Sequence, residues 1–194
     1  MIVPRRPDND VARVESLREL GLLDTPPEER FDALSRLAVQ MFQVPISYIS
    51  LMDSDRQFIK SNVGLTACST DRDESFCGHT IYQKKTLMIP DTLQDERFRD
   101  HPMVHGEPYT RFYCGQPLFT EDGYPVATLC LMDTQPRTLS QDQLEQLAAL
   151  GALAERELSL GTLLCAQHEL LETKDALLSA QQEVSRQLED ALQY

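Results

Sequence analysis

Cys77 and His79 are the side chains of this sequence whose types and spacing best suit chemistry near neutral pH. They lie two residues apart in the run SFCGH, where Ser75 is a typical N-cap residue and residues 76–85 suit a short helix. The free amides and the dipole of a first helical turn stabilise a thiolate or a bound anion. The pattern therefore favours a redox-active or ligand-contacting Cys77 with His79 as its proton partner. The alternative is structural, with Phe76 and Cys77 in the core and His79 held by hydrogen bonds.

The other cysteines are predicted to be reduced and unpaired. The total of five is odd and no CxxC pair occurs, which indicates thiols of a reducing compartment rather than a disulfide framework. Cys114 and Cys130 fall in apolar, strand-like runs and are expected to be inert core residues. Cys68 lies in a polar loop and is the expected exposed thiol.

His101 and His105 stand four residues apart, as two metal ligands on one helix would. However, Pro102 and Pro108 bracket them, and no cysteine or glutamate at zinc spacing accompanies them, so no metal site is expected. The aspartates of this region are instead expected to cap turns and to pair with interleaved arginines. These residues are Asp91, Asp95 and Asp100 on one side and Arg97, Arg99 and Arg111 on the other.

Composition narrows the function further. The 194 residues suit one domain with an appendage, and 31 acidic against 18 basic side chains give a formal charge of -13. An acidic chain is a poor ligand for nucleic acid or for an anionic membrane, so neither partner is expected. No apolar run is long enough to span a membrane, and the start lacks a secretion signal, which predicts a cytoplasmic protein.

The elements that position these residues follow from periodicity and turn signals. Apolar spacing predicts helices over 10–22 and 26–43, the second started by a capping box of Thr25 and Glu28. A second capping box, Ser140 with Gln143, starts a helix that runs to the end of the chain. The strands expected between these helices are 46–53, 56–64, 86–90, 110–119 and 124–133, the last two joined by a turn at 121–123. The fold class is therefore α/β, in the α+β sense: a small antiparallel sheet with flanking helices.

Several blocks, in this order, match one family: LGLLDTPPEERFD, VPISYISLMDSDRQFIKSNVGL, SFCGH, PDTLQDERFRDHPMV, RFYCGQPL and DGYPVATLCLMDTQPR. The sequence resembles a bacterial GAF domain of the type found at the N-terminus of sensor histidine kinases and diguanylate cyclases. The resemblance implies a central antiparallel sheet of about six strands, helices on its back, and a small-molecule pocket covered by the 60–110 segments. It places the sensory domain at 10–155, after a disordered arm at 1–9.

A ligand in such a pocket would meet a few polar groups among apolar side chains. The expected ligand-binding residues are Met52, Lys60, Phe76, Cys77, His79, Phe98, Arg111 and Tyr113. The nearby arginines and the helix start favour an anionic or carbonyl-bearing molecule, although no ligand can be named.

The resemblance also raises two other activities of the family. Some GAF domains hold a bilin through a cysteine next to a histidine, but here Gly78 separates Cys77 from His79, so a bilin is not expected. Others reduce free methionine sulfoxide with cysteines around the pocket, and Cys68, Cys77 and Cys114 could serve in that way. A ligand-free dimerisation adaptor is the remaining alternative.

The C-terminal helix carries an apolar stripe with a seven-residue repeat, which predicts a coiled coil over 156–194. Leucines on such a narrow stripe need a second chain to cover them. The alternative is a helix that folds back on its own domain. The expected dimerisation residues are Leu163, Leu164, Leu170, Leu171, Leu177, Leu178, Val184 and Leu188.

Together these features predict a homodimeric sensory module of bacterial signal transduction. Its N- and C-terminal helices would pack into a bundle, and a ligand or redox signal would shift that bundle and control an attached histidine kinase or diguanylate cyclase. Because the chain stops within a heptad, we expect it to be part of a longer protein. The chain itself is predicted not to be an enzyme.

Overall fold

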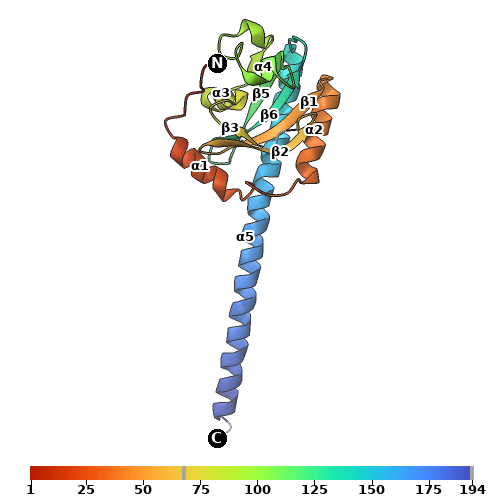
Figure 1. Cartoon of the computed structure of the whole chain (residues 1–194). Coiled ribbons are helices and arrows are strands. Elements are labelled where there is room, and N and C mark those ends of the chain that lie inside the picture. Colours follow the sequence, from red (N-terminus) through yellow and green to blue (C-terminus); the bar gives the residue numbers. More distant parts are fainter. Residues whose placement is uncertain (67–68, 193–194) are drawn as a thin grey trace.

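The structure is a computed structural model that describes residues 1–66 and 69–192, with few side chains beyond Gly161. Within the described residues, six strands form one antiparallel sheet in the order β3-β2-β1-β6-β5-β4 (Figure 1). The strands are β1 Ile46–Met52, β2 Arg56–Val63, β3 Ser69–Asp71, β4 Leu87–Ile89, β5 Phe112–Phe119 and β6 Pro125–Asp133. This confirms the predicted α+β fold and its sheet, with β3 as a strand that the sequence pattern did not predict.

The helices are α1 Asp10–Glu19, α2 Glu29–Phe42, α3 Phe76–Gln83, α4 Pro102–His105 and α5 Gln141–Leu192, with a 3-10 turn, η1, at Thr92–Gln94. The segment between β4 and β5, expected to be a turn-rich connection, contains η1 and α4. Helix α1 ends before the predicted residue 22, because Gly21 adopts a φ of 64° that a continuing helix does not allow.

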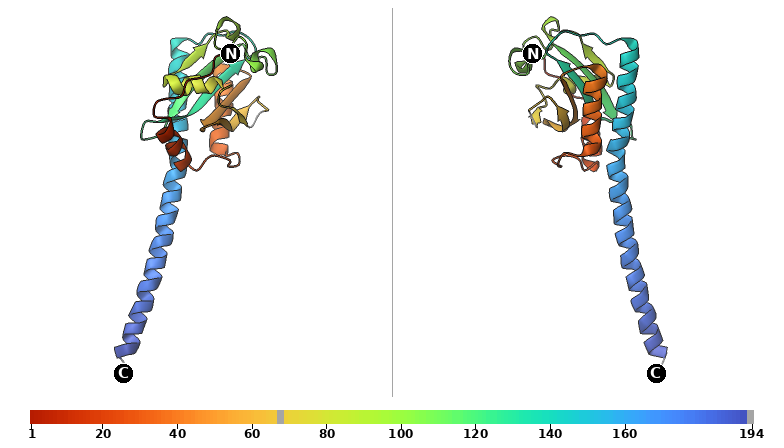
Figure 2. Two further views of the ribbon diagram at one scale, coloured as in Figure 1. Left: turned by 60° about the vertical axis from the view of Figure 1, so that its left-hand side comes forward. Right: turned by 90° about the vertical axis from the view of Figure 1, so that its right-hand side faces the viewer.

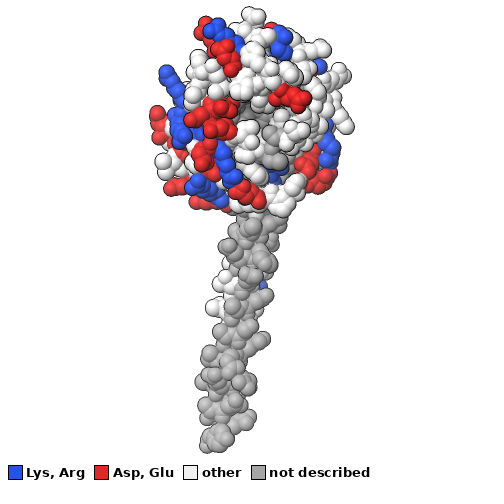
Figure 3. Space-filling model, in the orientation of Figure 1, with Lys and Arg blue, Asp and Glu red and all other residues white. Residues whose placement is uncertain are grey.

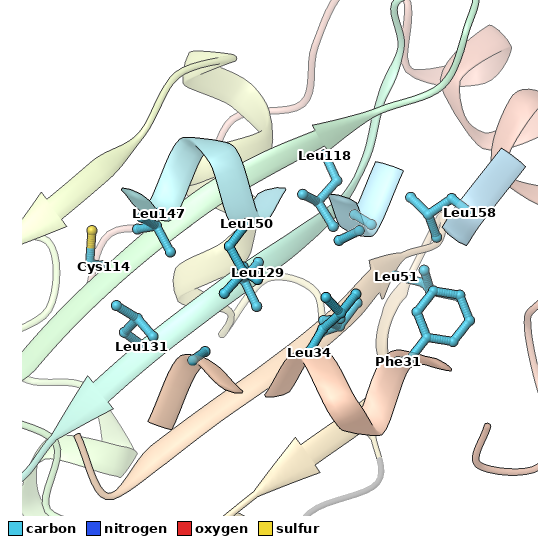
Figure 4. Close-up of a cluster of buried hydrophobic side chains, with 14 of the residues drawn as sticks. Phe31, Leu34, Leu51, Cys114, Leu118, Leu129, Leu131, Leu147, Leu150 and Leu158 are labelled. Atoms are coloured by element: carbon cyan, nitrogen blue, oxygen red, sulfur yellow. The ribbon is translucent and has the colours of Figure 1, made fainter. Parts of the chain in front are cut away.

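Helices α2 and α5 lie side by side on one face of the sheet (Figure 2). Their apolar faces and that face of the sheet form a core in which Phe31, Leu34, Leu118, Leu129 and Leu150 are buried (Figure 4). Burying a side chain of this size contributes about 1.5–3 kcal/mol. This face therefore fixes the first turns of α5 to the domain.

The opposite face of the sheet carries α3, α4 and the loop before α4. Its core contains Tyr48 and Met52 from β1, Tyr113 from β5 and Cys130 from β6, together with residues of α3. Side chains alternate along each strand, so one strand serves both faces: Leu129 and Leu131 face α5, whereas Cys130 faces α3.

Two of the three predicted helix N-caps are present in the structure. Ser140 and Gln143 form the predicted capping box, because each accepts a hydrogen bond from the backbone N–H of the other, at 3.0 and 3.2 Å. Ser75 caps α3 by accepting from the N–H of Gly78 at 3.0 Å. The capping box at Thr25 is wrong, because Pro27 disfavours helical backbone at the residue before it and α2 begins only at Glu29.

Residues 1–9, predicted to be a disordered arm, have defined contacts in the structure. The N–H of Ile2 donates to the carbonyl of Arg97 at 3.0 Å, and Pro4 and Pro7 are buried. Pro4 packs so closely over α3 that a Cβ at Gly78 would lie 2.6 Å from its ring. The arm therefore covers the outer side of α3.

Helix α5 runs on as one helix far beyond the body of the domain (Figure 1). It does not fold back, and Leu170, Leu171, Leu177 and Leu178 are exposed in the single chain. The side chains of Leu163, Leu164, Val184 and Leu188 lie outside the described residues. In the described part of the chain, no helix is long and apolar enough to cross a membrane.

Candidate functional site

Two cysteines and two tyrosines meet under α3, in the core of the sheet. The sulfurs of Cys77 and Cys130 lie 3.3 Å apart. The hydroxyl of Tyr48 lies 3.4 Å from the sulfur of Cys77, and the hydroxyl of Tyr113 donates to the same sulfur at 3.6 Å. All four side chains are buried. We call this group the thiol centre.

Hydroxyl groups extend the thiol centre along β1 and β6. Cys130 donates to the hydroxyl of Thr128 at 3.1 Å, and Thr128 is 2.8 Å from the hydroxyl of Ser50. Thr80 of α3 hydrogen-bonds Tyr113 at 2.9 Å. The buried polar groups thus satisfy one another, as a low-dielectric interior requires.

The surroundings of the two thiols affect their pKa values in opposite directions. Burial opposes ionisation of Cys77, but hydrogen bonding with Cys130, Ser50 and other neighbours lowers the pKa of its thiol to about 6. Burial and the adjacent Cys77 sulfur raise the pKa of Cys130 well above its usual range. Burial likewise raises the pKa values of both tyrosines, which therefore keep their hydroxyl protons. Cys77 is the group in this centre that can ionise near neutral pH.

Aromatic rings close the thiol centre from outside. Phe76 stacks on Phe98 with ring centroids 4.5 Å apart, and the ring centroid of Tyr113 lies 5.0 Å from that of Phe76. The ring of His79 meets the edge of Phe98 at 4.9 Å, and its Nε2 lies 3.0 Å from the carbonyl of Ile2. His79 therefore holds the N-terminal arm through its Nε2, and a role as proton partner of Cys77 stays a prediction.

His101 caps α4 from within the same face. Its Nδ1 accepts from the N–H of Met103 at 3.0 Å, so Nε2 carries the proton and donates to the carbonyl of Glu74. Burial lowers the pKa of His101 below its ordinary value of 6.5, despite the opposing hydrogen bond to Glu74. The neutral ring joins the loop before α3 to the start of α4.

A hollow of about 400 Å³ opens beside these residues, lined by Gly64, Leu65, Thr66, Thr70, Met103, Glu107, Pro108 and Tyr109. The ring of Tyr109 is exposed at its wall, on a backbone with a φ of 58°. Among the lining residues that the structure describes, Glu107 carries the one formal charge. The lining therefore suits a neutral or cationic molecule with an apolar part.

The structure brings together five of the residues predicted to bind a ligand. They lie in the core on the α3 face and are Met52, Phe76, Cys77, Phe98 and Tyr113, with His79 at their outer edge. None of them lines the hollow described above. The side chains predicted to contact a ligand instead pack against one another in the core on the α3 face. The site residues that sequence reasoning missed are Tyr48, Ser50, Thr128 and Cys130.

Lys60, predicted to bind a ligand, lies on the α2 face of the sheet, opposite the face that holds the other candidate residues. Its buried ammonium lies 2.6 Å from a carboxylate oxygen of Glu28 and donates to the carbonyl of Pro26 at 2.8 Å. Alternation from Phe58, which packs against the α2 face, puts Lys60 on that face too. The period of the strand was therefore the signal that could have placed it correctly.

The arginines expected to attract an anion are already paired. Arg111 holds Asp91 through two hydrogen bonds of 3.0 and 2.9 Å, and Arg97 holds Asp95. These pairs confirm the predicted interleaving of acids and bases. On the face shown in Figure 3, basic and acidic side chains likewise lie next to one another over the body. Neither arginine is therefore free to bind the anionic ligand that the sequence favoured.

The alternative of a methionine sulfoxide reductase predicts that Cys68, Cys77 and Cys114 lie near one pocket. Cys77 and Cys114 belong to opposite faces of the sheet, so their expected gathering is wrong, and Cys68 lies outside the described residues. Burial raises the pKa of the Cys114 thiol to about 12. In the described part of the chain, no three His, Cys, Asp or Glu side chains gather as metal ligands.

Comparison with known proteins identifies the family to which this fold belongs. Residues 26–158 match the model of the GAF domain family. The chain belongs to the GAF family. A cyclic di-GMP phosphodiesterase of Pseudomonas aeruginosa is 36% identical to this GAF protein over 160 residues, which cover 82% of this chain and 25% of the relative. The chain thus spans about a quarter of the length of the curated relative it matches.

Solved GAF structures have the same fold at low sequence identity. The GAF domain of a phosphoenolpyruvate-protein phosphotransferase from Acinetobacter is 18% identical, with a TM-score of 0.59, over 76% of this chain and 93% of that one. A free methionine-R-sulfoxide reductase of Neisseria meningitidis, solved with its substrate, is 16% identical, with a TM-score of 0.58, over 83% and 96%.

These comparisons contradict the prediction that the chain is not an enzyme. The curated relative is named as a phosphodiesterase, and the similar structures include methionine-R-sulfoxide reductases from Neisseria meningitidis and Thermoplasma acidophilum. The prediction treated the fold as purely regulatory, whereas the same scaffold occurs in enzymes.

Proposed function

We propose that this GAF domain is the sensory part of a protein that controls cyclic di-GMP turnover. The 36% identity to a cyclic di-GMP phosphodiesterase supports an output that acts on cyclic di-GMP. It favours such an output over the histidine kinase that the sequence analysis also allowed. The matched region is a quarter of that relative, which leaves room for separate catalytic regions there. The role of the GAF domain would be to bias the activity of such a region.

The continuity of α5 carries this proposal. Its N-terminal turns are part of the domain core, where Leu147, Leu150 and Leu158 are buried. The same helix then leaves the body and exposes Leu170 and Leu177. A rigid element with one end in a sensory core and the other outside the domain can transmit a change in packing.

We propose that the outer part of α5 pairs with α5 of a second copy. Leu170 and Leu177, and likewise Leu171 and Leu178, are each seven residues apart, as a coiled-coil seam requires. Helix α1 exposes Val11 and could join the same bundle. Pairing of this kind would set two output regions side by side.

A chain of ion pairs connects the sheet to α5 at the point where α5 leaves the body. Lys60 of β2 contacts Glu28, which accepts from Nε of Arg30 at 2.8 Å. Arg30 then donates to the backbone carbonyl of Glu157 in α5 and lies against Gly161. A shift of β2 would therefore reach α5 through charged contacts as well as through the core.

The ligand in this proposal occupies the hollow lined by Leu65, Met103, Glu107 and Tyr109. Its walls come from the segments after β2 and before β5, so a bound molecule would draw these two segments together. The single carboxylate among the described lining residues favours a neutral or cationic molecule.

A chimera tests the proposed function. In this chimera, the chain replaces the matched region of the Pseudomonas aeruginosa phosphodiesterase. Two further variants carry four or seven extra residues at the junction between α5 and the rest of the phosphodiesterase. Cyclic di-GMP hydrolysis is measured for all three. Seven residues preserve a coiled-coil seam, whereas four rotate it. We expect the four-residue insertion to change the rate at least fivefold and the seven-residue insertion to leave it within twofold. Equal rates with both insertions would refute transmission through α5.

A further inference from the structure

We propose that Cys77 and Cys130 form a reversible redox site, in which a hydroperoxide oxidises Cys77 and Cys130 then closes a disulfide. Their sulfurs lie 3.3 Å apart in the reduced protein. The two residues come from α3 and β6, which are 53 residues apart in sequence. This site does not depend on the proposed role in cyclic di-GMP turnover.

The geometry requires only a small movement. A disulfide has a bond length of about 2.05 Å, so the two sulfurs must approach by roughly 1.2 Å. Cys77 lies in the first turn of α3, which rests on β6 without a covalent link to it. A small displacement of this turn toward the sheet brings the sulfurs to bonding distance.

The surroundings of Cys77 favour its thiolate. Tyr113 donates a hydrogen bond to its sulfur, and the hydroxyl of Tyr48 lies within hydrogen-bond distance of the same atom. The first turn of α3, capped by Ser75, adds the positive end of its dipole. A thiolate is the nucleophile in thiol oxidation, so Cys77 is the attacking group and Cys130 is the resolving group.

The reaction balances with the peroxide as the only oxidant. The Cys77 thiolate attacks one peroxide oxygen, the O–O bond breaks, and the departing hydroxide or alkoxide takes up the proton that Cys77 lost. The thiol of Cys130 then attacks the sulfenic sulfur. The S–S bond forms as the S–O bond breaks, and the hydroxide leaves as water with the proton of Cys130. Two thiols have lost two electrons, and the peroxide has gained them.

The cover over this site is the N-terminal arm and α3. Both sulfurs are fully enclosed, so the peroxide reaches them when this cover opens. Pro4 rests on Gly78, and Ile2 holds His79, which places the arm directly over the turn that carries Cys77. The reaction is therefore expected to be slower than that of an exposed thiolate and faster than that of a buried neutral thiol.

Peptide mapping of the whole chain after exposure to hydrogen peroxide tests this site. Digestion with trypsin and a glutamate-specific protease separates Cys77, Cys114 and Cys130, since Glu121 lies between the last two. We expect a peptide pair joined by a Cys77–Cys130 disulfide, which dithiothreitol separates again. Oxidation of Cys77 should be at least tenfold faster than that of Cys114, which is equally buried on the other face.

Three variants separate the roles. In Cys130→Ala, Cys77 should stop at the sulfenic acid and react with dimedone, whereas Cys77→Ala should leave Cys130 reduced. Cys114→Ala is the matched control and should keep the rate of disulfide formation within twofold. The proposal is overturned if Cys77 is oxidised no faster than Cys114, or if its disulfide partner is any cysteine other than Cys130.

Discussion

The exposed leucines of α5 allow the proposed dimer to be tested quantitatively. Leu170, Leu171, Leu177 and Leu178 have exposed fractions of 70%, 50%, 71% and 46% in the single chain. Together they expose somewhat more than two whole leucine side chains. Full burial of a leucine contributes about 1.5–3 kcal/mol, so covering these four is worth roughly 4–7 kcal/mol per protomer. We predict that replacing all four by glutamine makes the chain monomeric.

The dimer contains this contribution twice, roughly 7–14 kcal/mol, against an association cost of about 4–15 kcal/mol. Because about 1.4 kcal/mol corresponds to a tenfold change in Kd, loss of the stripe should weaken the dimer at least a thousandfold. Sedimentation velocity at micromolar concentration measures this directly. The matched control replaces the same four leucines by methionine, which retains apolar area and helix propensity and should keep the dimer. A glutamine variant that sediments as the parent does would refute the reasoning and place any interface elsewhere.

Other substitutions test the interior. The pKa of His101 is lowered in the folded state, so the unfolded chain binds more protons. The free energy of unfolding should therefore fall as the pH drops below about 6.5. In His101→Asn, whose side chain can still accept from Met103, the urea midpoint should fall less between pH 7.5 and 5.5. Lys60→Met should lower the free energy of unfolding by about 2 kcal/mol, measured by urea denaturation, and an unchanged urea midpoint would contradict its buried contacts with Glu28 and Pro26. Gly115→Ala should cost about 1–3 kcal/mol in the same assay, because its Cβ would lie 2.1 Å from the hydroxyl of Tyr113; an unchanged midpoint would contradict this close contact.

The sequence pattern predicted the scaffold better than the site. Strand-like runs and turn signals place every strand except β3. Ser140 and Gln143 start α5 through a capping box, which is a local feature of the sequence. Such features depend on neighbours within a few residues. The start of α2 differs from the prediction for a local reason too. The capping signal at Thr25 predicted a helix from residue 26, but Pro27 disfavours helical backbone at the residue before it, and α2 begins at Glu29.

The thiol centre could not be predicted, because its members meet only through the sheet. Cys77 was identified from its position in a helix start, which is a local feature. The pairing of Cys130 with Cys77 requires the register of β6 and the height of α3 above it, and neither is encoded in the apolar run that contains Cys130. An apolar strand cysteine is usually inert. What distinguishes Cys130 is a neighbour from another element.

The position of the thiol centre explains how the redox site and the proposed signalling helix could influence each other. Cys130 faces α3, while Leu129 and Leu131, the residues on either side of it, pack in the core that holds α5. One strand therefore separates the two cysteines from the leucines that anchor the signalling helix. Because a close-packed core moves between discrete arrangements and does not deform smoothly, any displacement of β6 that accompanies the approach of α3 to Cys130 has to be accommodated on the α5 face. Oxidation of the Cys77–Cys130 pair should accordingly alter hydrogen exchange in the first turns of α5, at Leu147 and Leu150, while Cys77→Ala should abolish that response. Exchange that is unchanged on oxidation of the parent chain would show that the two faces of the sheet act independently.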